Sequence, residues 1–253
     1  MNLPEWFDMA YKYFERTIIG QTVNLPTNEI YGPLDENFIE MFKKVGKAVD
    51  DEMCVKSSYF IINNNVHFNL GSRTFYNYLL LKVDHRILEL NDGIMTGEPS
   101  IQGFYLFLIA LFYIGKGRKL RNLSHLEETR RIYLDFKSDC KIGPKHETLL
   151  NSFRSDNGIV VIQFFDSANS FEALSREGAM IEAAGLNNIC NKIKGSLKYL
   201  SGWSSTKIKN YGLLTLYCGY IKYVNECTKP TKLKEILFMK YSGSLVSLFV
   251  ISF

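Results

Sequence analysis

The chain has 253 residues, of which 46% are hydrophobic and 22% are charged. These values lie close to the averages for folded globular proteins, so they exclude a collagen-like, coiled-coil or wholly disordered chain. The length allows one large domain or a compact domain with extensions, and the net charge of +4 by itself says little about partners.

The first 72 residues are expected to form a helical N-terminal extension, with a helical pattern over 34–53. The opening segment MNLPEWFDMAYKYFERT mixes acidic and aromatic residues and has no basic-then-apolar order. It therefore does not resemble a secretory signal.

Three strand signals follow, each rich in β-branched or aromatic residues and bounded by Gly, Asn or Asp. They cover Phe75–Val83, Leu111–Gly115 and Gly158–Phe165. The longest apolar run, Phe104–Ile114, has eleven residues, well short of the roughly 20 that cross a bilayer. We therefore place this run in the core and expect no membrane span.

Helical patterns cover Lys119–Lys137, Lys145–Phe153, Phe171–Leu186 and parts of Lys207–Lys240. Strands and helices in this order predict an α+β fold in which helices pack on one small sheet. We expect the main domain over residues 73–200 and a basic helical C-terminal extension over 201–253.

The cysteines and histidines exclude several kinds of site. The five cysteines are odd in number, widely spaced and without a CxxC pair, which argues against a disulfide framework and a zinc ribbon. The four histidines never occur at the spacing of a helical zinc pair. We expect a reducing, intracellular location, nuclear, cytoplasmic or both.

Positive charge is concentrated in the C-terminal half. Residues 190–240 contain ten lysines against two glutamates, whereas the first 75 residues carry seven basic and ten acidic side chains. A basic surface of this kind suits a polyanion such as nucleic acid, and the alternative is a solvated lysine face.

Four sequence motifs follow one another in a characteristic order along the chain. Tyr76–Leu81 reads YNYLLL and Phe112–Gly117 reads FYIGKG; Arg121 and His125 follow, and Ser175–Gly195 reads SREGAMIEAAGLNNICNKIKG. Together they resemble the GIY-YIG nucleases, and most closely the animal endonucleases that carry ankyrin repeats and a LEM domain. The likeness covers about residues 75–195.

The resemblance implies a GIY-YIG core, with a small three-stranded antiparallel sheet flanked by helices, and a metal-dependent DNA endonuclease. The sequence departs from the family pattern at Lys82 and Val83, which replace an Asp-Pro pair, and at Gly178, which replaces Ala. The resemblance implies a catalytic set made of Tyr78, Tyr113, Arg121, His125, Glu177 and Asn191.

Glu177 shares a helix face with the apolar residues Leu174 and Ile181 at i−3 and i+4. A carboxylate on such a face is costly unless it meets a cation or several hydrogen bonds. Spacing alone leaves a metal site and an ion pair with an arginine equally open. The resemblance favours Glu177 as the ligand of one divalent cation, Mg²⁺ or Mn²⁺.

Arg121 and His125 form an i, i+4 pair, so one helix face presents a permanent cation and a titratable ring. Phosphodiester hydrolysis needs charge stabilisation as the phosphate oxygens become more negative. The resemblance gives that role to Arg121. Outside this set, His125 would be interpreted as structural.

Tyr78 lies on the first expected strand and Tyr113 on the second. Neighbouring strands run about 4.8 Å apart, so the two hydroxyls can converge if both face the same side. Catalysis by a phenol requires nearby cations to lower its pKa. The resemblance makes Tyr78 or His125 the group that deprotonates water, Tyr113 the group that orients the phosphate, and Asn191 a buttress. We expect Gly115 and Gly117 to bend a turn and to admit a phosphate to the backbone.

The resemblance implies DNA of a branched or junction-like kind as the expected partner, and the oligomeric state stays open. The alternative is a catalytically silent GIY-YIG module that binds DNA or acts as a scaffold. The basic residues expected to contact DNA are Lys116, Arg118, Lys119, Lys192, Lys194, Lys207 and Lys209.

Overall fold

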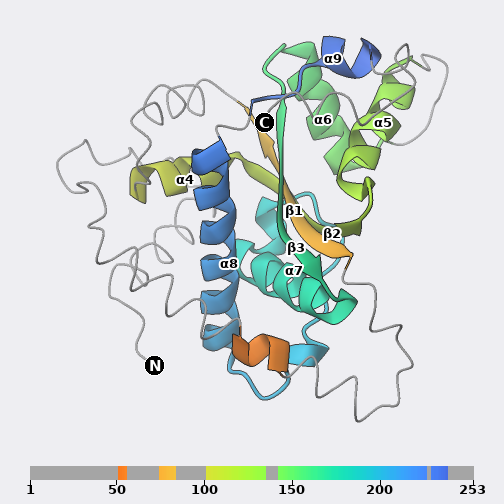
Figure 1. Ribbon diagram of the computed structural model, residues 1–253. Coiled ribbons are helices and arrows are strands. Elements are labelled where there is room, and N and C mark those ends of the chain that lie inside the picture. Colours follow the sequence, from red (N-terminus) through yellow and green to blue (C-terminus); the bar gives the residue numbers. More distant parts are fainter. Residues whose placement is uncertain (1–50, 56–73, 84–100, 135–141, 227–228, 239–253) are drawn as a thin grey trace.

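The computed structural model describes residues 51–55, 74–83, 101–134, 142–226 and 229–238 (Figure 1). Residues 51–55 are helical, and the rest of the helix expected over 34–53 lies outside the described residues. The same holds for the last fifteen residues, 239–253.

One antiparallel sheet lies at the centre of the molecule. Its strands are β1 (Phe75–Lys82), β2 (Leu111–Arg118) and β3 (Ile159–Ala168), and their order in the sheet is β2-β1-β3. Both neighbours pair antiparallel to β1. The three expected strands and the α+β class are therefore confirmed, although β2 and β3 each continue three residues beyond the expected end.

The apolar run before β2 is divided between two kinds of structure. Residues Ile101–Ala110 form helix α4, and β2 begins at the next residue, Leu111. The sequence predicts a buried run there but no helix, because a short continuous apolar stretch lacks the periodicity that separates a buried helix from a buried strand. Phe104 and Phe107 of α4 are buried in the core as expected.

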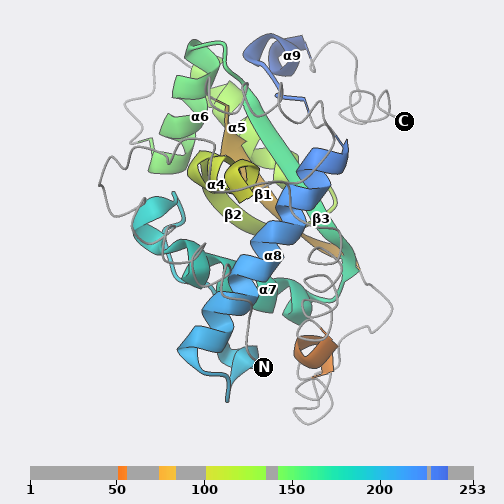
Figure 2. The same ribbon diagram turned by 90° about the vertical axis from the view of Figure 1, so that its left-hand side faces the viewer.

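The remaining helices follow the expected patterns closely. Figure 2 shows α8 crossing the sheet on the side away from α5 and α6. Their bounds are α5 Arg121–Leu134, α6 Pro144–Arg154, α7 Ser170–Ala184, α8 Ser205–Glu226 and α9 Leu233–Phe238, with short 3₁₀ turns at Leu186–Asn188 and Lys198–Leu200.

Alternate residues of β1 belong to different cores, as the two-residue period of a strand requires. Leu79 and Leu81 pack with α4, α7 and α8, whereas Tyr76, Tyr78 and Leu80 pack with α5, α6 and α9. The α7/α8 face is the larger apolar core. The α5/α6 face holds two buried tyrosines beside its aliphatic residues.

Helix α8, expected within a C-terminal extension, contributes directly to the main core. Its residues Leu213, Leu216 and Tyr220 are buried against β1 and α7 residues of the apolar core. A Cβ on Gly212 would overlap the backbone of Ala179, so this glycine lets α7 and α8 approach closely.

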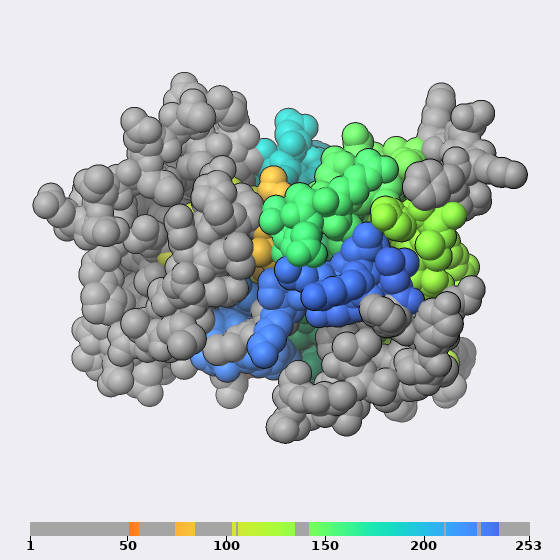
Figure 3. Space-filling view, turned by 90° about the horizontal axis from the view of Figure 1, so that it is seen from above, coloured from red at the N-terminus to blue at the C-terminus, as the bar shows by residue number. Residues whose placement is uncertain are grey.

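The chain then returns to the other side of the sheet. Thr231 pairs with Ile159 at the start of β3, and α9 contacts α5. Seen from above, α9 (blue) lies against the green surfaces of α5 and α6 (Figure 3). Across the described ranges, every helix is too short or too polar to cross a membrane.

Candidate active site

The sheet register brings the two expected tyrosines together. Tyr78 is opposite Gly115 and Leu80 is opposite Tyr113, so Tyr78 and Tyr113 lie diagonally on the same face. Their ring centroids are 6.1 Å apart. The expected convergence across β1 and β2 is therefore observed.

Gly115 and Gly117 make room for tyrosine rings. A Cβ on Gly115 would overlap the Tyr78 ring, and one on Gly117 would stand 3.0 Å from the Tyr76 ring. Both glycines lie within β2, so the expectation that they bend a turn is wrong. The left-handed turn residue is Lys119, with φ 54°, and the Tyr76 hydroxyl donates to its carbonyl at 2.7 Å.

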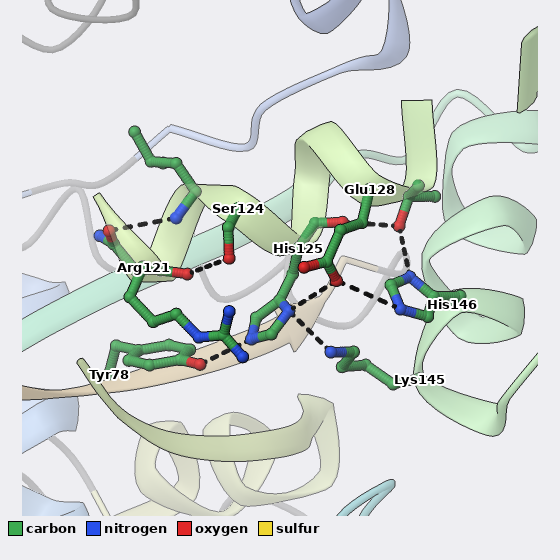
Figure 4. A network of polar contacts seen from close by, with 10 residues as sticks. Tyr78, Arg121, Ser124, His125, Glu128, Lys145 and His146 are labelled. Atoms are coloured by element: carbon green, nitrogen blue, oxygen red, sulfur yellow. Dashed lines mark hydrogen bonds and ion pairs between the residues drawn. The ribbon is translucent and has the colours of Figure 1, made fainter. Parts of the chain in front are cut away.

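His125 is held against Tyr78 on the α5/α6 face. Its Nε2 atom lies 2.7 Å from the Tyr78 hydroxyl oxygen, and its side chain is only 1% exposed. Figure 4 shows the imidazole between Tyr78 on one side and Glu128 and Lys145 on the other. The sequence predicted both residues at the site, and the structure joins them by a hydrogen bond.

The electrostatic environment keeps this pair uncharged. Burial, followed by the positive charge of Lys145, lowers the pKa of His125 from its ordinary 6.5 to about 4. Burial also raises the pKa of Tyr78, and Tyr113 adds to this effect. The expected lowering of the Tyr78 pKa by cations is therefore not seen, because desolvation outweighs the Arg121 charge. Neutral His125 carries one ring proton, so one of its two ring nitrogens can accept a proton.

Arg121 is the first residue of α5, one turn before His125. Its side chain is exposed, and it forms no ion pair within the described residues. In Figure 4 it extends toward the Tyr78 and His125 rings, and its charge acts to lower the pKa of Tyr78, Tyr113 and His125. An unpaired guanidinium in this position is available to a phosphate.

Glu177 is positioned by a well-capped helix. The Asn169 side chain accepts from the backbone N–H of Phe171 and Glu172, and Glu172 in turn accepts from the Asn169 N–H. This capping box fixes the start of α7 two turns before Glu177.

The Glu177 carboxylate faces β2. Its Oε1 atom accepts a hydrogen bond from the backbone N–H of Lys116 at 3.1 Å. Burial raises its pKa, while the Lys116 ammonium and this hydrogen bond act in the opposite direction. The nearby cation is Lys116 and not an arginine, so the alternative of an ion pair with an arginine is not seen among the described residues.

Asn191 fastens the following loop to the free edge of β2. Its Nδ2 atom donates to the Ile114 carbonyl at 2.7 Å, and its Oδ1 atom accepts from the Ile114 N–H at 3.1 Å. The Cys190 N–H also donates to the Phe112 carbonyl at 2.6 Å. Both polar groups of the Asn191 side chain are therefore bonded to β2, and its role as a buttress stays a prediction.

These elements enclose a pocket of about 650 Å³ between β2, α6, α7 and the Asn191 loop. Glu177, Tyr113 and Asn191 line it, together with the basic side chains of Lys145 and Lys192. A smaller hollow at the end of β2 is lined by basic residues that include Lys116, Arg118, Lys119 and Arg121.

The structure adds three residues that sequence reasoning missed. Lys145 Nζ lies 2.7 Å from His125 Nδ1, while Glu128 Oε2 lies 3.4 Å from that nitrogen and 3.5 Å from His146 Nε2. Lys145 and His146 come from α6, and only the packing of α6 against α5 brings them to the site. The available signal was the i, i+3 spacing of His125 and Glu128.

The expected DNA-binding residues occupy separate regions, and Lys116, Arg118 and Lys119 line the smaller hollow. Lys192 and Lys194 are exposed on the rim of the main pocket. Lys207 instead pairs with Glu52 at 2.7 Å and lies 4.3 Å from the centroid of the Trp203 ring. Contact of these residues with DNA stays a prediction.

The donor set around Glu177 fits a hard divalent cation that retains much of its own water. Within the described residues, no three His, Cys, Asp or Glu side chains cluster as a closed metal cage. A single half-buried carboxylate on a pocket wall matches the way Mg²⁺ binds through one or two carboxylates, water and substrate phosphate.

Comparison with protein families decides the assignment. Residues 75–238 match the model of the LEM-3-like GIY-YIG domain, which covers more than half of the chain. The chain belongs to this family. The GIY-YIG nuclease domain thus includes α8 and α9 as well as the sheet and α5–α7.

The relatives are ankyrin repeat and LEM domain-containing proteins. The mouse ankyrin repeat and LEM domain-containing protein 1 is 23% identical over 65% of this chain and 30% of the relative. The human protein is 27% identical over 47% of this chain and 20% of its own length.

The homolog from Caenorhabditis elegans is 29% identical over 68% of this chain and 25% of the relative. This chain therefore spans less than a third of these relatives. No solved structure matches the chain significantly.

Proposed function

We propose that this GIY-YIG domain is a metal-dependent endonuclease that hydrolyses DNA phosphodiester bonds, with branched DNA as its preferred substrate. The observation that carries the proposal is the 2.7 Å hydrogen bond between Tyr78 and His125, toward which Arg121 extends (Figure 4). Lys145, which contacts His125, lines the same pocket as Glu177. A proton acceptor, a fixed cation and a metal-ligating carboxylate are the groups that phosphodiester hydrolysis uses.

The proton of the attacking water passes along the Tyr78–His125 pair. Tyr78 is protonated in its buried position, so it accepts the water proton only as it passes its own proton to His125 Nε2. His125 is suited to this because its lowered pKa leaves it neutral above about pH 4. Glu128, near Nδ1, then stabilises the imidazolium that forms.

Arg121 stabilises the negative charge that develops on the phosphate oxygens, and Tyr113 fixes the phosphate from the β2 side. Glu177 would hold the divalent cation, Mg²⁺ or Mn²⁺, which would supply Lewis-acid stabilisation of the phosphate. Asn191 keeps β2 and the pocket wall in register through both backbone groups of Ile114.

The DNA path follows the basic rim of the site. Lys116, Arg118 and Lys119 line the hollow at the end of β2, and Lys192 and Lys194 stand on the other rim. Phosphate contacts of this kind position the duplex without reading its sequence.

Ile193 supports a preference for distorted DNA. It is 76% exposed between Lys192 and Lys194, on the loop that Asn191 fastens to β2. Proteins that bend DNA insert apolar side chains such as isoleucine between base steps, at a cost in lost stacking. A branch point has already lost part of that stacking, so it would accept Ile193 more readily than a continuous duplex.

The test is a metal-titrated cleavage assay on labelled duplex, flap and four-way-junction DNA. We expect cleavage only with Mg²⁺ or Mn²⁺, and faster cleavage of the branched substrates. Glu177→Gln should remove cleavage and retain DNA binding, because it deletes one ligand of a hard cation but no basic contact.

Glu182→Gln is the matched control on the same helix, and it should cleave like the wild type. DNA binding without cleavage at any metal concentration would instead identify a silent binding module. Wild-type cleavage by Glu177→Gln would contradict the metal assignment.

A further inference from the structure

One nitrogen of His125 has two incompatible partners. Lys145 Nζ lies 2.7 Å from Nδ1, and Glu128 Oε2 lies 3.4 Å from the same atom (Figure 4). A protonated lysine can only donate, whereas an ionised carboxylate can only accept. Neutral His125 can therefore satisfy one of them at a time.

The choice of partner determines what His125 can do for Tyr78. When Nδ1 accepts from Lys145, the ring proton sits on Nε2, which then donates to the Tyr78 oxygen. When Nδ1 donates to Glu128, Nε2 is free of its proton and accepts from the Tyr78 hydroxyl. Only the second tautomer can take the proton of Tyr78.

His146, which also lies near Glu128, cannot donate a hydrogen bond to it in the neutral state. The Thr129 hydroxyl donates to the His125 carbonyl at 2.7 Å, so its oxygen is left to accept from His146 Nδ1 at 3.0 Å. Neutral His146 then carries its proton on Nδ1, and its Nε2 cannot donate to Glu128. His125 is thus the histidine that Glu128 can bind in the neutral state.

Lys145 is placed where a substrate phosphate would reach it. It lines the pocket of Glu177 and Asn191, and its ammonium lies 5.1 Å from the centroid of the Tyr113 ring. It is half-buried, and this burial lowers its pKa. A phosphate offers the ammonium a stronger charge-assisted hydrogen bond than a neutral imidazole does.

We propose that Lys145 is a positioning residue that holds His125 in the Nε2-protonated tautomer. When a DNA phosphate binds Lys145, His125 changes to the Nδ1-protonated tautomer and donates a hydrogen bond from Nδ1 to Glu128. The site thereby acquires its proton acceptor only when DNA is in place. This inference rests on the proposed function and specifies how substrate activates that same site.

The change moves one proton and alters no net charge on His125. In the DNA-free state the proton is on Nε2 and Lys145 is paired with Nδ1. In the DNA-bound state the proton is on Nδ1, facing Glu128, and Lys145 is an ammonium paired with phosphate. The catalytic proton from Tyr78 then adds to the vacant Nε2.

The test is ¹⁵N NMR of the full chain labelled at histidine, at pH 7, with a chelator present so that DNA is not cut. The free protein should show His125 protonated at Nε2, and a four-way-junction oligonucleotide should shift the proton to Nδ1. Lys145→Met should show the Nδ1-protonated form without DNA, because the competing donor is gone. His125→Asn identifies the signal.

Two variants serve as controls. Lys192→Met removes another lysine of the same pocket and should leave the tautomer of the free protein unchanged. Glu128→Ala should abolish the DNA-induced shift, since the acceptor for Nδ1–H is missing. If free Lys145→Met matched the wild-type tautomer, or if DNA left the wild-type tautomer unchanged, the proposal would be wrong.

Kinetics separate a positioning role from a direct role in proton transfer. Lys145→Met should raise KM for DNA about tenfold through the lost phosphate contact, with a smaller fall in kcat. A collapse of kcat with unchanged KM would overturn the positioning role. Failure of the endonuclease proposal is seen separately, as absent cleavage despite a tautomer change on DNA addition.

Discussion

Alternate residues of strand β1 face an apolar core on one side of the sheet and a group of buried polar residues on the other. On β1, Leu79 and Leu81 enter an apolar core with α4, α7 and α8, whereas Tyr78 enters a face where His125 is also buried. Aliphatic burial stabilises the fold without directional requirements. Buried polar groups cost stability unless their hydrogen bonds are satisfied.

The difference shows where the molecule places its function. The α5/α6 face holds neutral but ionisable groups against each other, and helices with exposed basic ends cover it. The α7/α8 face keeps the sheet rigid enough to hold them. Neighbouring residues of one strand should therefore respond very differently to substitution.

Tyr78→Phe should give the largest effect, and it should fall on catalysis. Removal of a proton-transfer group typically lowers the rate by about 10²–10⁴-fold, so we expect a loss of about 10³-fold in single-turnover cleavage. The free energy of unfolding should change by only about 1 kcal/mol, the usual contribution of one hydrogen bond.

Tyr220→Phe, on the opposite face, is the control for removal of a buried hydroxyl, and its cleavage rate should equal that of the wild type. A normal rate for Tyr78→Phe combined with a large loss of stability would make Tyr78 a core residue.

Leu79→Ala should give the reverse result. Leu79 is 0% exposed, and truncation of such a leucine costs about 2–5 kcal/mol through lost burial and a new cavity. Urea unfolding should show this loss, while the folded fraction cleaves DNA at nearly the wild-type rate. A specific loss of rate in fully folded Leu79→Ala would remove the distinction between the faces.

His125→Ala should lower cleavage by about 10²-fold and change its pH dependence. Since the pKa of His125 is about 4, the wild-type rate should rise with pH through about 4 and not near 6.5. The His125→Ala variant should lose this rise in rate with pH. If the rise persisted in the variant, the group that titrates would be another residue.

The same residue affects stability with a defined sign. The folded protein binds the His125 proton less tightly than the unfolded chain does, so stability rises with pH. The contribution is complete above about 6.5 and is lost as pH falls toward about 4. In thermal melts across this pH window, the difference in Tm between wild type and His125→Ala should therefore be smaller at low pH than at neutral pH.

The smallest effects concern the lysines. Replacing Lys192 and Lys194 together should flatten the plot of log affinity against log salt by up to about two units. The same change at Lys207 and Lys209 should flatten it less, because Lys207 is already paired with Glu52. If both double variants flattened the salt-dependence plot equally, Lys207 and Lys209 would contact phosphates too, and the DNA would also run along α8.

The sequence predicted the parts whose signals are local. The strands β1 and β3 follow from their aromatic and β-branched residues, and α5 to α8 follow from helical periodicity. The helix α4 does not, because its apolar run has no polar face to mark a period. Burial of α8 also escaped prediction, since it lies within the lysine-rich segment 190–240, which suggested a surface extension.

At the site, the resemblance supplied the residues but not their electrostatics. The sequence brought Tyr78 and His125 into one set, whereas their burial, which keeps both neutral, arises only when α5 closes over β1. Lys145 could not be predicted, because nothing in its local sequence marks its approach to His125 from α6.

The pair of hydrogen bonds between Asn191 and the backbone of Ile114 also affects how the protein behaves at high concentration. β2 is an edge strand, and the backbone groups of an exposed edge can pair with a strand of another molecule. Asn191 occupies both backbone groups of Ile114, and Cys190 occupies the carbonyl of Phe112. The loop that shapes the pocket thus shields the sheet from edge-to-edge aggregation, so a variant at Asn191 would lose solubility together with activity.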